Sequence, residues 1–363
     1  MRRTFSIIAA FLLACTLPCK AQIIVPEPSL EPLRVSIDTA EVFIIGDVMM
    51  HSAQLSKDCH PFLQHIAPKS KKADISIANA EFSVAGKPYT GYPTFSTPEY
   101  YPEYLVSDYG ADILLTANNH ILDKGSKGLE RTLETYRHLQ DSLGVQFTGS
   151  ALSPEEYEQV YPLIVRANGI RVALINFTYG TNLGGSTEWP KVQRMDKEAI
   201  AAAFQRAKEH HADFIIALPH WGEEYSLKHN KKQQEWAEWL VAQGADAIVG
   251  AHPHVVQDST TVNGVPVFYS IGNAVSNMSA INTRLELSVT LRFVLNRVSG
   301  EKQMLQPEVN FMWCTLPGTL TDNYSTIFIK EWANRKNDWL TPYDYENMLQ
   351  TYQRVKTATG ISD

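Results

Sequence analysis

Polar side chains able to bind metal or transfer protons follow several short apolar runs of this 363-residue chain. The runs and the residues after them are 42–45 before Asp47, 75–77 before Asn79 and Glu81, 113–115 before Asn118, Asn119 and His120, 214–218 before His220, and 247–249 before His252 and His254. Strands buried on both faces are continuously apolar, and parallel α/β sheets bind ligands beyond the carboxyl ends of their strands. The pattern therefore predicts a metal-binding or hydrolytic site with several histidines along one edge of a sheet.

Two histidines stand two residues apart in the sequence Gly-Ala-His-Pro-His at 250–254. Pro253 restricts the backbone between His252 and His254, so their imidazoles can present neighbouring nitrogens to one or two metal ions. Taken alone, the pair is equally consistent with two hydrogen-bonded loop histidines. The other polar clusters favour metal binding.

The second cluster contains Asn119 and His120. An amide oxygen is a hard metal ligand, and His120 beside it could serve as a general acid or as a phosphate-binding group. Asp123 could orient that imidazole or cap a helix that begins near residue 126, and we favour the cap.

A third cluster follows the apolar run 214–218. Pro219 and Gly222 indicate a tight turn around His220, which is either a ligand or an exposed loop histidine. The pocket residues expected next to it are Trp221, Glu224 and Tyr225. The carboxylates of Asp47 and Glu81 would supply the negative charge that ions bound by oxygen and imidazole ligands require.

The elements that must position these residues alternate between strands and helices, which predicts an α/β fold with a largely parallel sheet. Helices are expected over 126–143, from an N-cap at Asp196, over 232–243 and over 341–357. The alternating segment 286–294 predicts an antiparallel strand, and 308–314 is expected to pair with it.

The motifs together resemble the CapA family, named for poly-γ-glutamate capsule synthesis and similar to the calcineurin-like metallophosphatases. The matching segments are GDVMMH at 46–51, NAEF at 79–82, LLTANNHILDKG at 114–125, PHWGEEY at 219–225, GAHPHVVQ at 250–257 and YSIGN at 269–273. The resemblance implies a metallophosphatase-like layered sheet sandwich with flanking helices, an αββα architecture, over residues 41–300.

The resemblance also implies roles for individual residues. The implied metal ligands are Asp47, Glu81, Asn119, His220, His252 and His254, with His120 as the catalytic histidine. The superfamily motif Asp-x-His is not preserved, because Met49 stands where its histidine would be and His51 comes two residues later. His51 is therefore kept as an alternative metal or substrate ligand, and the site could hold one or two divalent ions. Mn, Fe or Zn would suit such a shell.

The N-terminus predicts export. Arg2 and Arg3 precede an apolar run, and the small residue Ala21 fits a signal-peptidase cleavage site. This pattern predicts a signal peptide over residues 1–21 and a linker over 22–40. Cleavage before Cys15 with attachment of a lipid is the alternative, so the expected location is periplasmic, outer-membrane-associated or secreted. No later segment is apolar enough to span a membrane. Residues 301–363 are expected to form a strand and a helical extension packed on the domain.

Charge and chemistry limit the function. Loss of residues 1–21 removes three cations and lowers the formal charge from -7 to -10, which argues against nucleic-acid binding. The leading hypothesis is a metal-dependent phosphoesterase acting on an envelope or extracellular polymer. The alternatives are a non-catalytic polymer-binding accessory protein and a γ-glutamyl amide hydrolase. Cys59 and Cys314 could pair in an oxidising compartment, and the sequence does not determine the oligomeric state.

Overall fold

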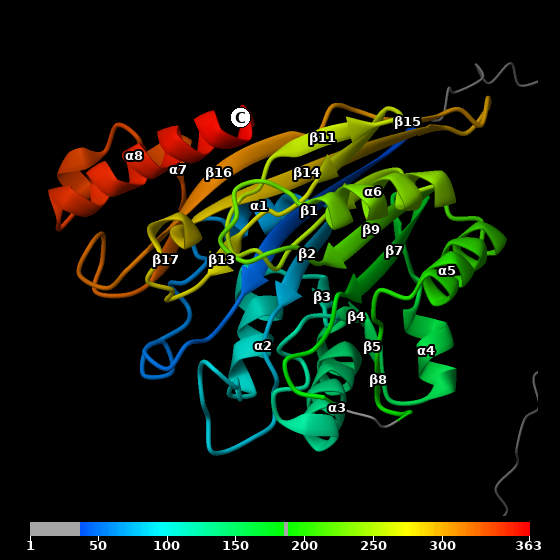
Figure 1. Cartoon of the computed structure of the whole chain (residues 1–363), viewed down its shortest axis with the longest axis horizontal. Helices are drawn as coiled ribbons and strands as arrows, with labels where there is room; N and C mark the ends of the chain where they lie inside the picture. Colours follow the sequence, from blue (N-terminus) through cyan, green and yellow to red (C-terminus); the bar gives the residue numbers. More distant parts are fainter. Residues whose placement is uncertain (1–36, 185–187) are drawn as a thin grey trace, which may run out of the picture. The chain divides into compact units, whose positions relative to one another are not determined.

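The computed structural model describes residues 37–184 and 188–363 (Figure 1). The expected signal peptide, the lipid-attachment alternative at Cys15 and residues 22–36 of the linker lie outside the described residues. Strand β1 (Ile37–Val48) starts four residues before the expected domain boundary at Glu41, and it pairs from Ile37 onward with the antiparallel strand β14 (Leu285–Asn296).

A large mixed sheet has the strand order β17-β16-β14-β1-β2-β3-β4, with β13 paired to β1 and β15 paired to β14. Its other strands are β2 (Ile75–Ala80), β3 (Ile113–Leu115), β4 (Gln146–Thr148), β13 (Asn273–Val275), β15 (Lys302–Met304), β16 (Glu308–Thr315) and β17 (Ser325–Phe328). Strands β1 to β4 are parallel, whereas β14, β16 and β17 are antiparallel. The expected pairing of 286–294 with 308–314 is confirmed.

A second sheet has the order β11-β12-β10-β9-β7-β6. Its strands are β6 (Leu163–Ala167), β7 (Ile170–Thr178), β9 (Phe214–His220), β10 (Ala247–Val249), β11 (Ser259–Val262) and β12 (Val265–Phe268). The central strands β7, β9, β10 and β12 are parallel. Two short strands, β5 (Ser150–Ala151) and β8 (Lys191–Val192), pair separately.

Successive side chains of β1 face two different cores. Val42 and Ile44 pack in the core shared with the second sheet, where Phe214 and Phe293 stack with ring centroids 4.3 Å apart. Phe43 packs on the opposite face, in the core that the helices cover. Burial of these apolar faces drives the layering. Figure 1 shows α1 (Ala67–Lys72), α2 (Tyr100–Tyr104) and α3 (Gly125–Leu143) beside the large sheet, and α5 (Lys197–Glu209) and α6 (Lys231–Gln243) beside the second. The expected αββα architecture is confirmed.

The helices follow their predicted ends closely. Asp196 caps α5 by accepting hydrogen bonds from two backbone N–H groups, an arrangement typically worth about 1 kcal/mol. Helix α6 begins with a capping box formed by Asn230 and Gln233, and Gly244 ends it in the left-handed conformation. The remaining α-helices are α4 (Pro154–Val160), α7 (Ile329–Trp332) and α8 (Pro342–Thr359), together with the π-helical turn Leu105–Tyr109 and the 3-10 helices Ile281–Arg284 and Lys336–Asp338.

The C-terminal part adds β15, β16 and β17 to the large sheet, and α8 packs against the core cluster that includes β14 and β16. A buried bidentate ion pair holds α8, because Arg284 donates to both carboxylate oxygens of Asp344 at 2.6 and 2.8 Å. Cys59 and Cys314 are both free buried thiols, so they do not pair. Among the described residues, no helix has both the length and the apolarity needed to cross a membrane.

Candidate metal centre

The carboxyl ends of strands from both sheets meet at one site. Asp47 ends β1, Glu81 follows β2 and Asn119 follows β3 in the large sheet, whereas His220 ends β9 and His252 and His254 follow β10 in the second sheet. The sequence predicted a single sheet edge. Instead, the two stacked sheets place their carboxyl ends side by side, and each supplies part of the site.

The side chains converge in two overlapping groups. Ligand atoms of Asp47, Glu81 and His254 lie within 4.8 Å of one another, as do those of Glu81, His220 and His252. The Asn119 Oδ1 lies 2.7 Å from His220 Nε2, which places it at the second group. Glu81 belongs to both groups, so its carboxylate stands where it could bridge two ions.

The backbone is strained where the imidazoles enter. His252 has a φ of 99° and His254 a φ of 58°, which non-glycine residues rarely adopt and which cluster at functional sites. The backbone N–H of Tyr225 donates to the Pro253 carbonyl at 2.9 Å and holds this loop against the β9–α6 loop. At Gly46, an added Cβ would lie 2.0 Å from the Gly272 carbonyl oxygen, so the close approach of these two backbone segments requires glycine at position 46.

The pKa values of the two buried carboxyls are shifted in opposite directions. Burial by itself raises the pKa of Asp47, but the hydrogen bond with His254 is the main cause that lowers it to about 2, and the hydrogen bond with Asn79 lowers it further. Burial and the negative charge of Asp47 raise the pKa of Glu81 well above its usual value. Burial and the neighbouring Asp47 therefore both oppose a negative charge on Glu81, and a cation beside it would favour that charge.

The three imidazoles are prepared for ligation in different ways. Burial lowers the pKa of His220 to about 3 and that of His252 well below its usual value, so both are neutral. Burial also opposes the charge on His254, but hydrogen bonds with Asp47 and Asn273 raise its pKa. The Nδ1–H of His254 donates to Asn273 Oδ1 at 2.9 Å and leaves Nε2, 4.0 Å from Glu81 Oε1, for a ligand.

Several polar atoms of these groups have no hydrogen-bond partner in the protein. Both carboxylate oxygens of Glu81 and the Nδ1 of His252 are buried and unpaired. Buried polar groups are usually satisfied, so such atoms require a partner such as an ion or an ordered water. The mixed set of carboxylate, amide and imidazole donors fits divalent Mn, Fe or Zn.

His120 lies beside the centre and is held by Asp123. Its Nδ1 lies 2.7 Å from Asp123 Oδ2, which also accepts the Phe95 backbone N–H at 2.8 Å. The preferred capping role of Asp123 was wrong, since α3 has Lys124 at its N-cap and no side-chain cap. Asp123 is directed inward because His120 and Phe95 both donate to it.

Four further residues contribute to the site, and of these only Asn79 was named from the sequence, as a polar residue after the run 75–77. The Nδ2 of Asn79 donates to Asp47 Oδ1 at 2.7 Å, and Asn273 orients His254. Tyr179 packs over His252 with ring centroids 4.5 Å apart, and Asn182 lies 3.4 Å from both ring nitrogens of His120. Asn79 and Asn273 stand inside recognised motifs. Tyr179 and Asn182 follow β7, whose buried run was not counted among the site strands although it has the same pattern.

A cleft of about 440 Å³ opens above the centre. Residues on its walls include His51, Tyr92, His120, Asn182, Glu224 and Tyr225, and its described lining contains no lysine or arginine. Trp221 does not border this cleft, because its buried indole donates to the Tyr269 carbonyl at 2.9 Å and lines a separate cavity of about 70 Å³. Tyr225 and Glu224 therefore form the pocket wall on this side.

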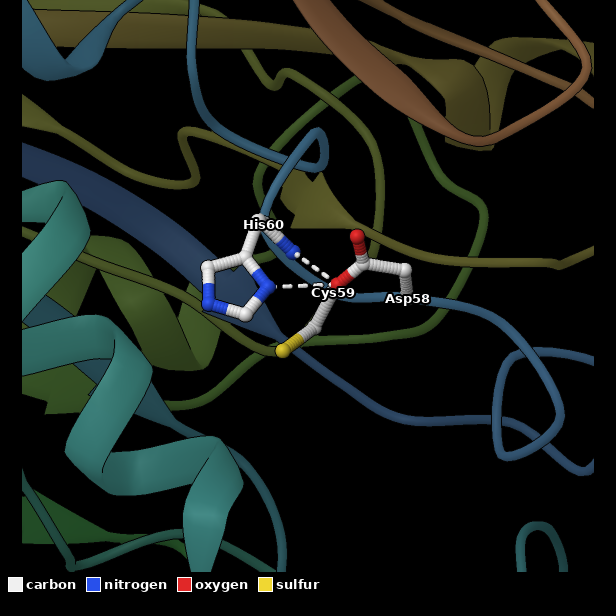
Figure 2. A group of neighbouring side chains, drawn as sticks. All are labelled: Asp58, Cys59 and His60. Carbon is white, nitrogen blue, oxygen red and sulfur yellow. Dashed lines mark hydrogen bonds and ion pairs between the residues drawn. The ribbon is translucent and has the colours of Figure 1, made fainter.

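A separate group of polar side chains occurs at Asp58, Cys59 and His60 (Figure 2). The Oδ1 of Asp58 accepts the His60 backbone N–H at 3.1 Å and lies 2.5 Å from His60 Nδ1. Burial and the charge of Asp58 raise the pKa of the Cys59 thiol to about 12, so this thiol is protonated. The three residues form a turn whose carboxylate and imidazole already satisfy each other.

The comparison with known families is decisive, because residues 41–278 match the bacterial capsule synthesis protein family PGA_cap. The chain belongs to this family. Its matched region contains all six ligand candidates and His120, and it ends before β14.

Two relatives carry capsule names. The chain is 29% identical over 261 residues to the PGA biosynthesis protein CapA of Bacillus subtilis, covering 69% of this chain and 66% of that protein. It is 27% identical over 294 residues to the capsule biosynthesis protein CapA of Bacillus anthracis, covering 77% and 68%. This member of the family thus spans about two thirds of the length of these relatives.

Solved structures are more distant. A 5'-nucleotidase precursor from Thermus thermophilus matches with a TM-score of 0.46 and 13% identity, covering 88% of this chain and 59% of that one. The NAD nucleotidase of Haemophilus influenzae matches with a TM-score of 0.44 and 14% identity, covering 88% and 63%.

Proposed function

We propose that this family member is an exported, metal-dependent hydrolase of the phosphoester type that acts on a capsule or other cell-envelope polymer. The observation that carries the proposal is Glu81, whose two buried oxygens accept no hydrogen bond from the described residues and which belongs to both ligand groups. A capsule-related substrate is supported by the names of the two relatives.

The residues of the centre would hold one or two divalent ions. Asp47, Glu81 and His254 surround one position, and Glu81, Asn119, His220 and His252 surround the other. When bound, such ions polarise a phosphoryl oxygen and lower the pKa of water toward neutrality. The protein then has to position the ester and to protonate the leaving oxygen.

His120 is suited to that proton transfer. Asp123 accepts from Nδ1, so Nε2 is the nitrogen left for the substrate, and the ring borders the cleft. A protonated His120 can donate from Nε2 to the leaving oxygen, and Asp123 stabilises the charged imidazole while it does so. Because the described lining of the cleft lacks lysine and arginine, phosphate charge would have to be balanced mainly at the metal centre.

Two other functions remain proposals supported by the name of the B. subtilis relative, a PGA biosynthesis protein. The same centre could cleave a γ-glutamyl amide, since a Lewis acid polarises a carbonyl as well as a phosphoryl oxygen. A non-catalytic protein could instead bind the polymer during its synthesis or export.

Metal analysis of the purified protein, joined to a screen of phosphomonoesters, phosphodiesters and γ-glutamyl polymers, tests these functions. His252→Ala should lose metal and activity, whereas His138→Ala, which removes an exposed imidazole from α3, should behave like the wild type. Cleavage of the γ-glutamyl polymer alone would favour the amidase. Metal-free protein that binds polymer equally well in all three forms would refute the hydrolase and favour the accessory role.

The proposed export is tested by fractionation of cells that produce the full chain. Processing at Ala21 would release the mature protein, whereas lipid attachment at Cys15 would bring it to the membrane fraction in a form that Cys15→Ser abolishes. Retention of the unprocessed chain in the cytoplasm would contradict export.

A further inference from the structure

One of the two ligand groups is short of an imidazole. Asp47, Glu81 and His254 form this group, and the residue two positions after Asp47 is the buried Met49 rather than a histidine. His51 does not replace it, because His51 belongs to none of the ligand groups found among the described residues. Its Nδ1 accepts the Asn277 backbone N–H at 3.2 Å, and its ring packs edge-on against Phe95.

A different side chain approaches this position from the second sheet. A carboxylate oxygen of Glu224 lies within 4.8 Å of ring nitrogens of both His252 and His254. Glu224 is exposed at the wall of the cleft, so it is open to both solvent and substrate. Within the group of Glu224, His252 and His254, the family resemblance implies a metal-binding role for both histidines and for Glu224 none.

The backbone holds Glu224 at this place. It lies in the loop that links His220 at the end of β9 to α6, two residues after Gly222, whose φ is 101°. The next residue, Tyr225, has a φ of 66° and donates its backbone N–H to the Pro253 carbonyl between the two histidines. The carboxylate is therefore anchored by a neighbouring main-chain hydrogen bond rather than carried on a free loop.

We propose that Glu224 is a ligand of the metal centre and supplies an oxygen on the side where its carboxylate approaches both His252 and His254. The inference rests on the proposed metal-dependent function and specifies how its shell is built. A third carboxylate lowers the net charge of a two-ion centre by one unit, and it replaces an imidazole with a harder donor. Carboxylate ligands favour Mn, whereas imidazole ligands favour Zn, so a third carboxylate makes Mn the expected ion.

The chain offers a matched control. Glu223 is the adjacent residue, equally exposed, with the same side chain, and it belongs to none of the ligand groups of the described residues. Glu224→Gln and Glu223→Gln remove the same charge from the same loop, so a general electrostatic effect would appear in both variants. Because both side chains are exposed, neither substitution removes core packing.

Calorimetric titration of metal-stripped protein with Mn²⁺, together with the Mn²⁺ electron paramagnetic resonance spectrum, tests the proposal. The wild type should bind two Mn²⁺ ions. Glu224→Gln should weaken one of them by about tenfold or more, since even outer partners of metal ligands typically contribute 10- to 100-fold, and should lose the spectral coupling between the ions. Glu223→Gln and His51→Ala should keep the wild-type affinities.

The inference would be overturned if Glu224→Gln bound both Mn²⁺ ions with wild-type affinity, or if His51→Ala lost one of the two Mn²⁺ sites. Either result would leave the proposed function standing. Wild-type protein that binds no divalent ion would instead overturn the proposed function and the inference with it. Equal thermal unfolding of the metal-free variants and wild type confirms that altered affinity comes from the site and not from the fold.

Discussion

At the scale of single residues, the centre consists of groups that are costly to bury unless each has a partner. Burial raises the pKa of both carboxyls, but the hydrogen bond with His254 helps to lower that of Asp47 to about 2, whereas the negative charge of Asp47 adds to the rise at Glu81. His120 differs from the ligand candidates in its partner, since its Nδ1 is paired with Asp123, which belongs to none of the ligand groups of the described residues. These differences separate residues that would hold ions from residues that would act on the substrate.

Asp123→Asn should lower kcat with little effect on metal content. The amide cannot stabilise a protonated His120 as a carboxylate does, so the expected loss of kcat is a large part of the roughly 10²- to 10⁴-fold that a positioned general acid contributes. The measurement is kcat on the best phosphoester, accompanied by metal analysis and a pH–rate profile. His120→Ala should lose at least as much.

The double variant provides the control for this prediction. If Asp123 acts through His120, adding Asp123→Asn to His120→Ala should cause almost no further loss of kcat, because residues that act as a unit are not additive. Additive losses, or an unshifted pH profile in Asp123→Asn, would mean that Asp123 serves only the fold through its bond with Phe95.

Residue types alone indicated a site where apolar runs end in carboxylates, amides and imidazoles, and the family resemblance then narrowed these residues to the six ligand candidates. The role of Asp123 could not be predicted in the same way. Its position before a helix favours a cap, and the competing donors are His120 and the Phe95 backbone, the second of which is 28 residues away in sequence. Asn182 likewise depends on a loop whose path the sequence does not show.

At the scale of elements, the centre depends on how closely β1 approaches the segment that follows β12. The Asp47 backbone N–H donates to the Gly272 carbonyl at 3.0 Å, and Gly46 N–H donates to the buried carboxyl of Glu286 at 2.7 Å. This crossing brings β1 and β13 side by side in parallel pairing. The chain can approach so closely only because Gly46 has no side chain.

Gly46→Ala should therefore destabilise the protein and weaken metal binding together. The new Cβ would meet the Gly272 carbonyl at 2.0 Å, and overpacking of this kind typically costs about 1–3 kcal/mol. Urea unfolding and metal titration measure the two effects. Gly180→Ala is the control, since its Cβ would meet no atom within 4 Å and should change stability by less than about 0.5 kcal/mol. Equal stability of the two variants would refute the close approach.

A second element-scale prediction concerns pH. Glu308 on β16 pairs with Lys69 of α1 and Arg292 of β14, and the hydrogen bond with Lys69 is the main cause that lowers its pKa to about 2 from an ordinary 4.5. A lowered folded-state pKa stabilises the fold above about pH 4.5, and this contribution is lost as the pH falls toward 2.

Glu308→Gln should thus be less stable than the wild type at pH 7, and the difference should shrink between pH 4.5 and 2. Exposed pairs are usually worth less than about 1 kcal/mol, so the effect is small. Urea unfolding at several pH values measures it. Glu301→Gln is the control because Glu301 is exposed and in no ion pair among the described residues. A difference between Glu308→Gln and wild type that persists undiminished at pH 2 would contradict the assignment.

Elements with strong periodicity were predictable, including α3, α6 and α8 to within two residues of their ends. The division of the strands between two sheets was not predictable from periodicity, because strands of both sheets are buried on both faces and read as the same apolar runs. The family resemblance supplied the αββα layering. The strand β7 was missed as a site element because the site residues that follow it, Tyr179 and Asn182, are neither acids nor histidines.

At the scale of the whole molecule, the family match ends at residue 278, yet the large sheet continues through β14, β16 and β17. The C-terminal part is therefore integral to the folded unit although it supplies none of the ligand candidates. Its attachment depends on the buried pair of Arg284 and Asp344. Arg284 also donates to the Cys314 carbonyl at 2.9 Å and lies 4.3 Å from the Trp313 ring centroid.

Asp344→Ala should destabilise the protein by about 3–5 kcal/mol, because it leaves the Arg284 guanidinium buried without its counter-charge. The destabilisation should be greatest around α8, so amide hydrogen exchange should increase most over 342–359 while the metal affinity stays unchanged.

The double variant Arg284→Met with Asp344→Ala should recover part of the lost stability, since no buried charge then remains unpaired. Urea unfolding of the two single variants and the double variant completes the cycle. If the double variant loses the full sum of the single effects, the ion pair is not what holds α8, and the apolar contacts of Tyr345 and Met348 with the same core must hold it instead.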